Sequence, residues 1–204
     1  PMLSKNKKFL FIHLPKTGGN SLQERLKAYS EDAIVSINSI QDGVERFEVR
    51  NEYPGIHKHS SLSDYQKVLP ESVFSQLFVC STIRNPWERM VSFYFSPHRK
   101  VNEWDRNEFI ALVNSVKSLP DLLSTPASTH WSENADFILR FEHLDEDYRT
   151  LCEKLKLEYA PLNIRNKSSR NHYSQYYDDE LIQLVAERFA PEVQYGKYIF
   201  EADV

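Results

Sequence analysis

The apolar residues of this chain gather in short, nearly continuous runs that are separated by longer polar stretches. Three of these runs are rich in β-branched and aromatic residues, and they cover residues 9–14, 77–83 and 137–141. Short runs without alternation are typical of strands that are buried on both faces of a parallel sheet. The pattern therefore predicts three central strands.

Each apolar run is followed by a stretch with the 3.6-residue period of an amphipathic helix. We expect these helices over residues 21–29, 86–95 and 145–157, and further helices over 62–69, 107–116 and 179–189. Asp178 is the expected N-cap of the last one. Strand–helix alternation predicts an α/β, three-layer fold with a central parallel β-sheet flanked by helices, in a single domain over residues 1–204. The polar stretches 99–105, 123–134 and 163–177 are expected to be loops.

Composition narrows the class of protein. The chain has 204 residues, 41% hydrophobic and 26% charged, which suits one globular domain with a good core. Its net charge of −4 argues against a broad surface for nucleic acid or anionic membranes. No apolar stretch reaches about 18 residues, so no membrane span is expected. The two cysteines, Cys80 and Cys152, lie in an apolar run and a helical pattern, which favours a reducing compartment.

The first strand runs directly into the segment PKTGGNS, which contains two of the five glycines of the chain, Gly18 and Gly19. A helix N-terminus offers unpaired N–H groups and partial positive charge, and glycine lets a ligand approach the backbone closely. Lys16 would add a full charge. The segment therefore predicts a site for an anion such as a phosphate, although an ordinary tight turn with a solvated lysine is the alternative.

This segment differs from a Walker A loop, in which the lysine follows the glycines. A helix terminus contributes about 0.3–1 kcal/mol to anion binding. A nucleotide bound at micromolar affinity needs about 8 kcal/mol. A second anion site is therefore required.

The segment CSTIRNPWERMVSFYF offers that second site after the second apolar run. Asn85 suits a helix N-cap and Pro86 suits the first helical position. Arg84 then lies at the carboxyl end of a strand, where open α/β sheets bind ligands, and its planar fork fits a phosphate. Ser92 can donate a hydroxyl to the same group. The alternative is that Arg84 and Arg89 pair with acids such as Glu88.

Together, PKTGG-N-S and R-N-P-W-E-R-M-V-S-F-Y, about 65 residues apart, resemble the sulfotransferase family, in particular its carbohydrate-type and bacterial branch. The family uses 3′-phosphoadenosine-5′-phosphosulfate (PAPS) and releases the bisphosphate PAP. The resemblance implies the P-loop NTPase-like sulfotransferase fold and no metal. It extends to FILRFEHLDEDY, which looks like the family's strand followed by E-x-L, and to the C-terminal segment from His172 to Phe200.

The resemblance also implies roles for individual residues. The first loop would hold the 5′-phosphosulfate, with Lys16 also at the bridging oxygen as a catalytic group, and the second would hold the 3′-phosphate through Arg84 and Ser92. A basic loop in NKSSRNHY would fold over the nucleotide. The cofactor-binding residues implied in this way are Lys16, Thr17, Gly18, Gly19, Asn20, Ser21, Arg84, Ser92, Lys167, Ser169 and Arg170.

Transfer to a hydroxyl needs a general base, and histidine is the best-tuned side chain for this. In GIHKHSSLSDY, His57 and His59 face the same way if the segment is extended, just before a helix capped near Ser61. A surface pair of histidines is the alternative. Related sulfotransferases align their base with His59, so we expect His59 to be the base, with His57 as the fallback. His13 lies within the first apolar run and is expected to pack in the core.

The expected function is therefore sulfuryl transfer from PAPS to a hydroxyl, and the resemblance favours a glycan acceptor. A P-loop-like kinase and an inactive nucleotide- or glycan-binding module are the alternatives. No nucleic-acid partner is expected. A bacterial cytoplasmic location is favoured, with a Golgi-type enzyme that lost its anchor as the other reading.

Overall fold

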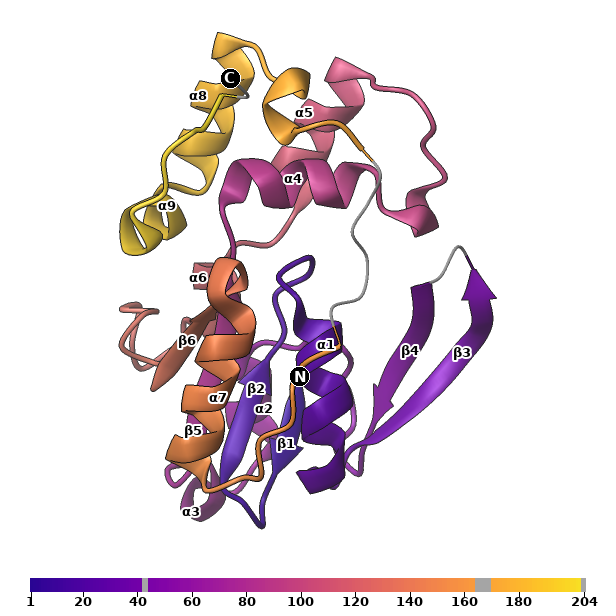
Figure 1. The fold of residues 1–204 in the computed structure, drawn as a ribbon. Helices are drawn as coiled ribbons and strands as arrows, with labels where there is room; N and C mark the ends of the chain where they lie inside the picture. Colours follow the sequence, from indigo (N-terminus) through magenta and orange to yellow (C-terminus); the bar gives the residue numbers. More distant parts are fainter. Residues whose placement is uncertain (42–43, 164–169, 203–204) are drawn as a thin grey trace.

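The structure is a computed structural model that describes residues 1–41, 44–163 and 170–202. Its centre is a four-stranded sheet in the order β1 (Met2–Ser4), β2 (Phe9–Ile12), β5 (Phe78–Ile83) and β6 (Phe137–Arg140), shown in Figure 1. Strands β2, β5 and β6 run parallel, whereas β1 pairs antiparallel with β2. The chain is therefore an α/β protein with a mixed sheet that is flanked by helices.

The three predicted strands are confirmed, and the reason for their continuous apolar pattern is visible in the core. Phe9 and Phe11 point to one face of the sheet, whereas Leu10 and Ile12 point to the other, and all four side chains are fully buried. Helices α1 (Gly19–Leu26) and α7 (Leu144–Leu155) cover the first face. Helices α2 (Leu62–Val68) and α6 (Leu119–Leu123) cover the second.

A third group of helices lies beyond the carboxyl ends of the parallel strands (Figure 1). It has its own apolar core, which includes Trp87, Met90, Phe109 and Val185. Its members are α4 (Pro86–Tyr94), α5 (Arg106–Ser115), α8 (Asp179–Arg188) and α9 (Ala190–Gly196). Short helical elements complete the described chain: α3 (Glu71–Phe74), η1 (Lys27–Tyr29), η2 (Pro97–Arg99), η3 (Phe141–His143) and η4 (Tyr173–Tyr176).

The predicted helix boundaries hold to within about two residues except at α1, which gives way to the 3-10 turn η1 three residues before the predicted end. Several of the helix starts are marked by local capping signals. Asn85 accepts hydrogen bonds from the amides of Trp87 and Glu88, with Pro86 in the first turn of α4. Asp178 accepts from the Leu181 amide at the start of α8, as predicted. Ser61 and Asp64 form a reciprocal capping box at the start of α2.

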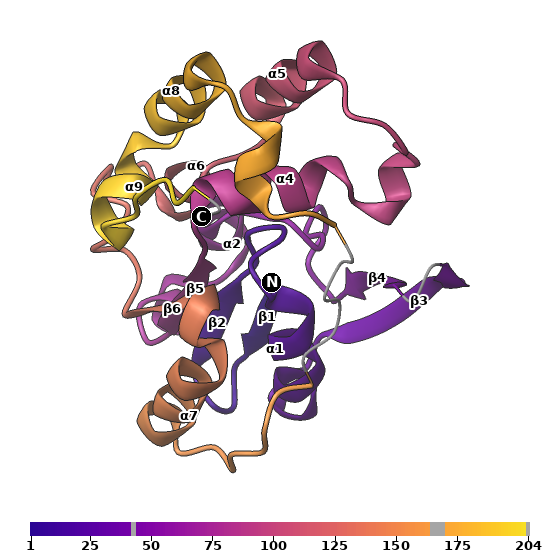
Figure 2. The same ribbon diagram turned by 45° about the horizontal axis from the view of Figure 1, so that its top comes forward.

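Two parts of the sheet structure differ from the prediction. The sheet is not purely parallel, because the three-residue strand β1 adds an antiparallel edge. The chain also forms a separate two-stranded ribbon from β3 (Ala33–Gln41) and β4 (Val44–Arg50), which extends away from the four-stranded sheet in Figures 1 and 2. A β-branched run followed by the dipeptide Asp-Gly is the sequence signal that would have revealed this hairpin.

The predicted loops 99–105 and 123–134 contain little regular structure. The predicted loop 163–177 is only partly described, and its described part includes η4. No helix among the described residues has the length and apolar character that are required to cross a bilayer.

Candidate functional site

The first predicted motif lies between β2 and α1, and the second lies between β5 and α4. Because β2 and β5 are neighbouring parallel strands, both segments emerge at the same edge of the sheet. Figure 1 shows the loop after β2 directly beneath α4. The carboxyl ends of parallel strands are where open α/β sheets bind ligands. The fold thus brings together two segments that are about 65 residues apart in the chain.

The start of α1 leaves amide groups free for an anion. Its N-cap is Gly18, at φ 82°, and no side chain caps the helix. The amides of Gly18, Gly19 and Asn20 donate to no acceptor among the described residues, whereas those of Ser21 and Leu22 bond to the Gly18 carbonyl. Free amides at a helix N-terminus carry the positive end of the helix dipole. This arrangement suits a phosphate or sulfate oxygen.

The two glycines are also required by packing. A Cβ on Gly19 would lie 2.0 Å from Cδ2 of His13, and a Cβ on Gly18 would lie 2.5 Å from Cδ2 of Leu144. Gly18 additionally has a left-handed φ, which glycine adopts without steric cost. The pair therefore lets α1 begin against the His13 ring and the start of α7.

Lys16 has a strained backbone and a partly buried amine. Its φ of 68° places a non-glycine residue in the left-handed region, at a cost of about 1–2 kcal/mol. Its Nζ donates to Oγ of Ser96 at 2.9 Å. Burial, and after it the nearby charges of Arg84, Arg170 and Lys58, together lower the pKa of Lys16 to about 8. A bound anion would relieve this repulsion and raise the pKa again.

Arg84 is buried and donates a hydrogen bond to the backbone of the first loop. Its Nη1 donates to the Lys16 carbonyl at 2.9 Å, and its Nη2 donates to Glu88 at 2.8 Å. Its guanidinium lies 3.9 Å from the centre of the Phe141 ring. The alternative pairing with Glu88 is thus present, but the fork also reaches the loop. Arg84 links the two motifs whether or not it also touches a phosphate.

Arg170 is the third cation of the site. It is half-buried, and its pKa is lowered first by burial and then by Arg84, with Glu88 acting in the opposite direction. Lys16, Arg84 and Arg170 are therefore close enough to repel one another. Lys167 and Ser169, which were predicted to bind cofactor from the same loop, lie outside the described residues.

The hydroxyl side chains of the predicted set differ in what they contact. Thr17 is fully buried, donates to the Leu14 carbonyl at 2.5 Å and contacts the hydroxyl of Thr82. Ser21 donates to the Asn163 carbonyl at 2.9 Å. Ser92 lies on α4, partly exposed, and its hydroxyl has no hydrogen-bond partner in the described part of the chain. Their roles in cofactor binding remain predictions.

His59 lies beside the loop through its contact with His13. The two rings are 5.1 Å apart between centroids, and Nδ1 of His59 lies 3.4 Å from the His13 carbonyl. Burial lowers the pKa of His59 to about 4, so its imidazole is neutral at pH 7. If Nδ1–H donates to that carbonyl, Nε2 is the atom that can accept a proton. His57 is exposed, and its Nδ1 accepts the amide hydrogen of His59.

His13 is buried as predicted, but it does more than fill the core. Burial keeps the pKa of His13 well below its usual value, and its Nδ1 has no partner among the described groups. Its ring lies between His59 and Gly19. His13 and Ser96 were not predicted as site residues. The signal for His13 was its position three residues before Lys16 at the end of a strand, whereas Ser96 gave none.

A separate hollow of about 300 Å³ lies away from both motifs, near β1 and the residues that follow β4. Its lining includes Glu31, Asp32 and Glu52, whose charge would repel phosphates. The described residues also contain no group of three histidine, cysteine or acidic side chains arranged to hold a metal ion. The chemistry of the site at the edge of the sheet is therefore that of cations, amides and a neutral histidine.

No protein-family model matches this chain, and no curated protein sequence matches it significantly.

Proposed function

We propose that the chain is a sulfotransferase that moves a sulfuryl group from PAPS to an acceptor hydroxyl, with a carbohydrate as the favoured acceptor. The proposal includes the P-loop-like sulfotransferase fold, to which a parallel β2–β5–β6 core with helices on both faces is suited. The observation that carries it is the grouping of Lys16, Arg84 and Arg170 around the loop that leads into the uncapped start of α1. Three cations that repel one another beside free amides suit a ligand with several negative charges.

The proposed reaction uses these groups in defined ways. The acceptor oxygen attacks the sulfur of the donor, the bond from sulfur to the bridging phosphate oxygen breaks, and PAP leaves. Nε2 of His59 takes the acceptor's proton, and the Lys16 ammonium stabilises the charge on the leaving oxygen. A pKa of about 4 makes His59 a weak base, but the negative charge of a bound donor would raise that pKa toward neutrality.

Thermal unfolding in the presence of three nucleotides tests the proposal. We expect PAP to raise the unfolding midpoint by several degrees, because a ligand at 100 times its Kd adds about 2.7 kcal/mol to the free energy of unfolding. We expect 5′-AMP, which lacks the 3′-phosphate, to have a much smaller effect. A shift with ATP and magnesium but none with PAP would overturn the proposal in favour of a kinase.

Replacement of His59 by alanine tests the proposed base. We expect turnover to fall by about 10²–10⁴-fold while PAP still stabilises the protein, because proton transfer is lost and the anion site is kept. His57→Ala is the matched control, since His57 is the exposed neighbour and should retain turnover. The assay uses radiolabelled donor with a panel of glycans. Unchanged turnover in His59→Ala would remove this residue from the mechanism.

A further inference from the structure

The backbone on both sides of Lys16 is held by arginines from the second motif. Nε of Arg89 donates to the Pro15 carbonyl at 3.1 Å, and Nη1 of Arg84 donates to the Lys16 carbonyl at 2.9 Å. These carbonyls belong to the two planar peptide groups that flank the Cα of Lys16. Holding both planes fixes φ and ψ of Lys16, which has a left-handed φ of 68°.

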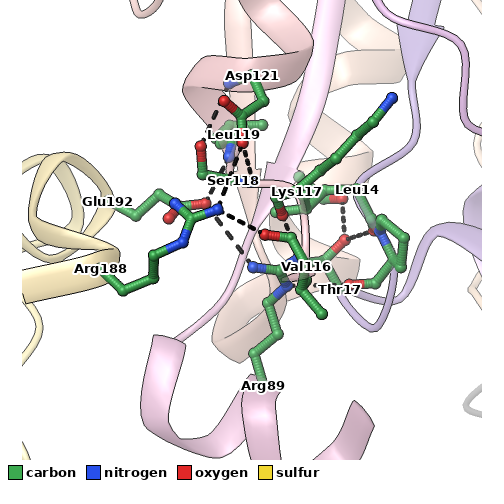
Figure 3. A network of polar contacts seen from close by, with 12 residues as sticks. Leu14, Thr17, Arg89, Val116, Lys117, Ser118, Leu119, Asp121, Arg188 and Glu192 are labelled. Atoms are coloured by element: carbon green, nitrogen blue, oxygen red, sulfur yellow. Dashed lines mark hydrogen bonds and ion pairs between the residues drawn. The ribbon is translucent and has the colours of Figure 1, made fainter. Parts of the chain in front are cut away.

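Arg89 cannot reach a ligand, because only 1% of it is exposed. Its Nη2 donates to the Lys117 carbonyl at 2.9 Å, and its Nη1 lies 3.9 Å from Oε1 of Glu192. That same Oε1 accepts the Leu119 amide at 2.7 Å. Figure 3 shows the Arg89 side chain reaching up to the segment that contains Val116 and Lys117, with Glu192 on one side and the loop that contains Thr17 on the other.

We propose that Arg89 is a positioning residue for Lys16: anchored by Glu192 and the Lys117 carbonyl, it holds the Pro15 carbonyl and keeps the Lys16 amine in place beside Ser96. This inference rests on the proposed role of Lys16 in anion binding. It gives Arg84 and Arg89 different tasks. Arg84 is at the edge of the site, shared between Glu88 and the loop, whereas Arg89 acts only through the backbone.

For holding the Pro15 carbonyl, the planar donor geometry of the Arg89 guanidinium is more important than its charge. A guanidinium can donate to the Pro15 and Lys117 carbonyls at once, because its donors point in fixed directions. A lysine ammonium at this position would keep the charge opposite Glu192 but could not span both carbonyls in the same way. Geometry and charge can therefore be separated by substitution.

The test compares Arg89→Lys, the double variant Arg89→Met/Glu192→Gln, and Arg188→Met. The double variant leaves no buried charge unpaired, and its glutamine can still accept the Leu119 amide. Arg188→Met is the matched control, because Arg188 donates to the neighbouring Val116 carbonyl at 2.8 Å without touching the loop. Each folded variant is measured for the pH dependence of Lys16 modification by an amine reagent, read by mass spectrometry, and for PAP affinity by calorimetry.

We expect the apparent pKa of the Lys16 amine to rise from about 8 toward its ordinary 10.5 in both Arg89 variants, as the amine moves into solvent. PAP affinity should fall at least tenfold in these variants and stay within about twofold in Arg188→Met. Folded Arg89 variants with the native Lys16 pKa and PAP affinity would overturn the inference. If the double variant does not fold, Arg89→Lys alone decides the test, because it keeps the buried charge pair with Glu192.

The experiments distinguish a failure of the proposed sulfotransferase function from a failure of the proposed role of Arg89. If the unmodified protein does not bind PAP, the proposed function is wrong, yet the Lys16 modification profile still tells whether Arg89 positions that amine. If PAP binds to the unmodified protein and equally well to the folded Arg89 variants, the function stands and Arg89 has a purely structural role.

Discussion

At the end of β2, Lys16 combines a left-handed backbone with an amine that has three cationic neighbours. Both features destabilise the folded chain. Burial and repulsion favour the neutral amine, so a charged Lys16 at pH 7 costs the fold free energy. A bound anion, as proposed for this site, would offset that cost.

Replacement of Lys16 by methionine should therefore stabilise the protein at pH 7 by about 1–3 kcal/mol while it abolishes PAP binding. The pKa of Lys16 is about 8 in the fold and 10.5 ordinarily, so between these values the unfolded chain binds more protons. The contribution of Lys16 to the free energy of unfolding therefore becomes more favourable to the fold as the pH rises from about 8 to 10.5. The advantage of Lys16→Met should be constant below pH 8 and shrink above it, as measured by urea unfolding from pH 6.5 to 9.5. A variant less stable than the parent at pH 7 would contradict this.

The sequence was enough to predict that Lys16 and Arg84 share a site. Each residue follows a recognisable strand and precedes a recognisable helix, and neighbouring parallel strands end at the same edge of a sheet. The sequence could not reveal that Arg84 and Arg89 hold consecutive carbonyls of the first loop. Which acceptor a buried guanidinium finds depends on how α4 sits over the sheet. That placement is a property of the tertiary structure.

Among the elements, the start of α1 depends on close contact with a histidine ring. Gly19 lies against His13, which in turn contacts His59. Helices α4 and α8, which begin with capping side chains, were predicted to within about a residue. The five-residue helix α6 was missed although it begins with a capping box. Strand β1 was missed because three residues carry no periodicity, and β3–β4 were missed although Asp-Gly is a hairpin signal.

Gly19→Ala should destabilise the protein by about 1–3 kcal/mol, because the new Cβ would lie 2.0 Å from a buried ring that has little room to move. In a His13→Ala background the same change should be neutral or slightly stabilising, since alanine is the better helix former. Urea unfolding of the four proteins gives the coupling energy. An equal cost in both backgrounds would show that the ring is not the cause.

Gly55→Ala is a control that measures the cost of a left-handed backbone without a steric clash. Gly55 has a φ of 82°, and nothing lies within 4 Å of its Cβ position. The substitution should cost about 1–2 kcal/mol from the left-handed conformation. Because no side chain is displaced, this cost should not change in the His13→Ala background.

At the scale of the whole molecule, the described residues form a body with three apolar clusters and a ribbon, β3–β4, that pairs only with itself. An isolated two-stranded ribbon is marginally stable in water. Strands β2 and β5, by contrast, are buried between helices on both faces. The free energy of local opening should therefore differ greatly between the two sheets.

Hydrogen exchange measured by mass spectrometry should show this difference. We expect the amides of β2 and β5 to exchange only through global unfolding, and those of β3 and β4 to exchange orders of magnitude faster. Equal protection of both sheets would contradict this. If the ribbon is protected and its protection decreases when the protein is diluted, a second copy of the chain covers the ribbon.

The helix α1 begins without a side-chain cap, and an anion bound there would serve as the cap that the sequence omits. The native state would then be completed by a small molecule drawn from the cell. The fraction of chains that open, and so the rate at which proteases clear them, would follow the supply of that molecule. Cells short of it would hold less of the protein with no change in its synthesis.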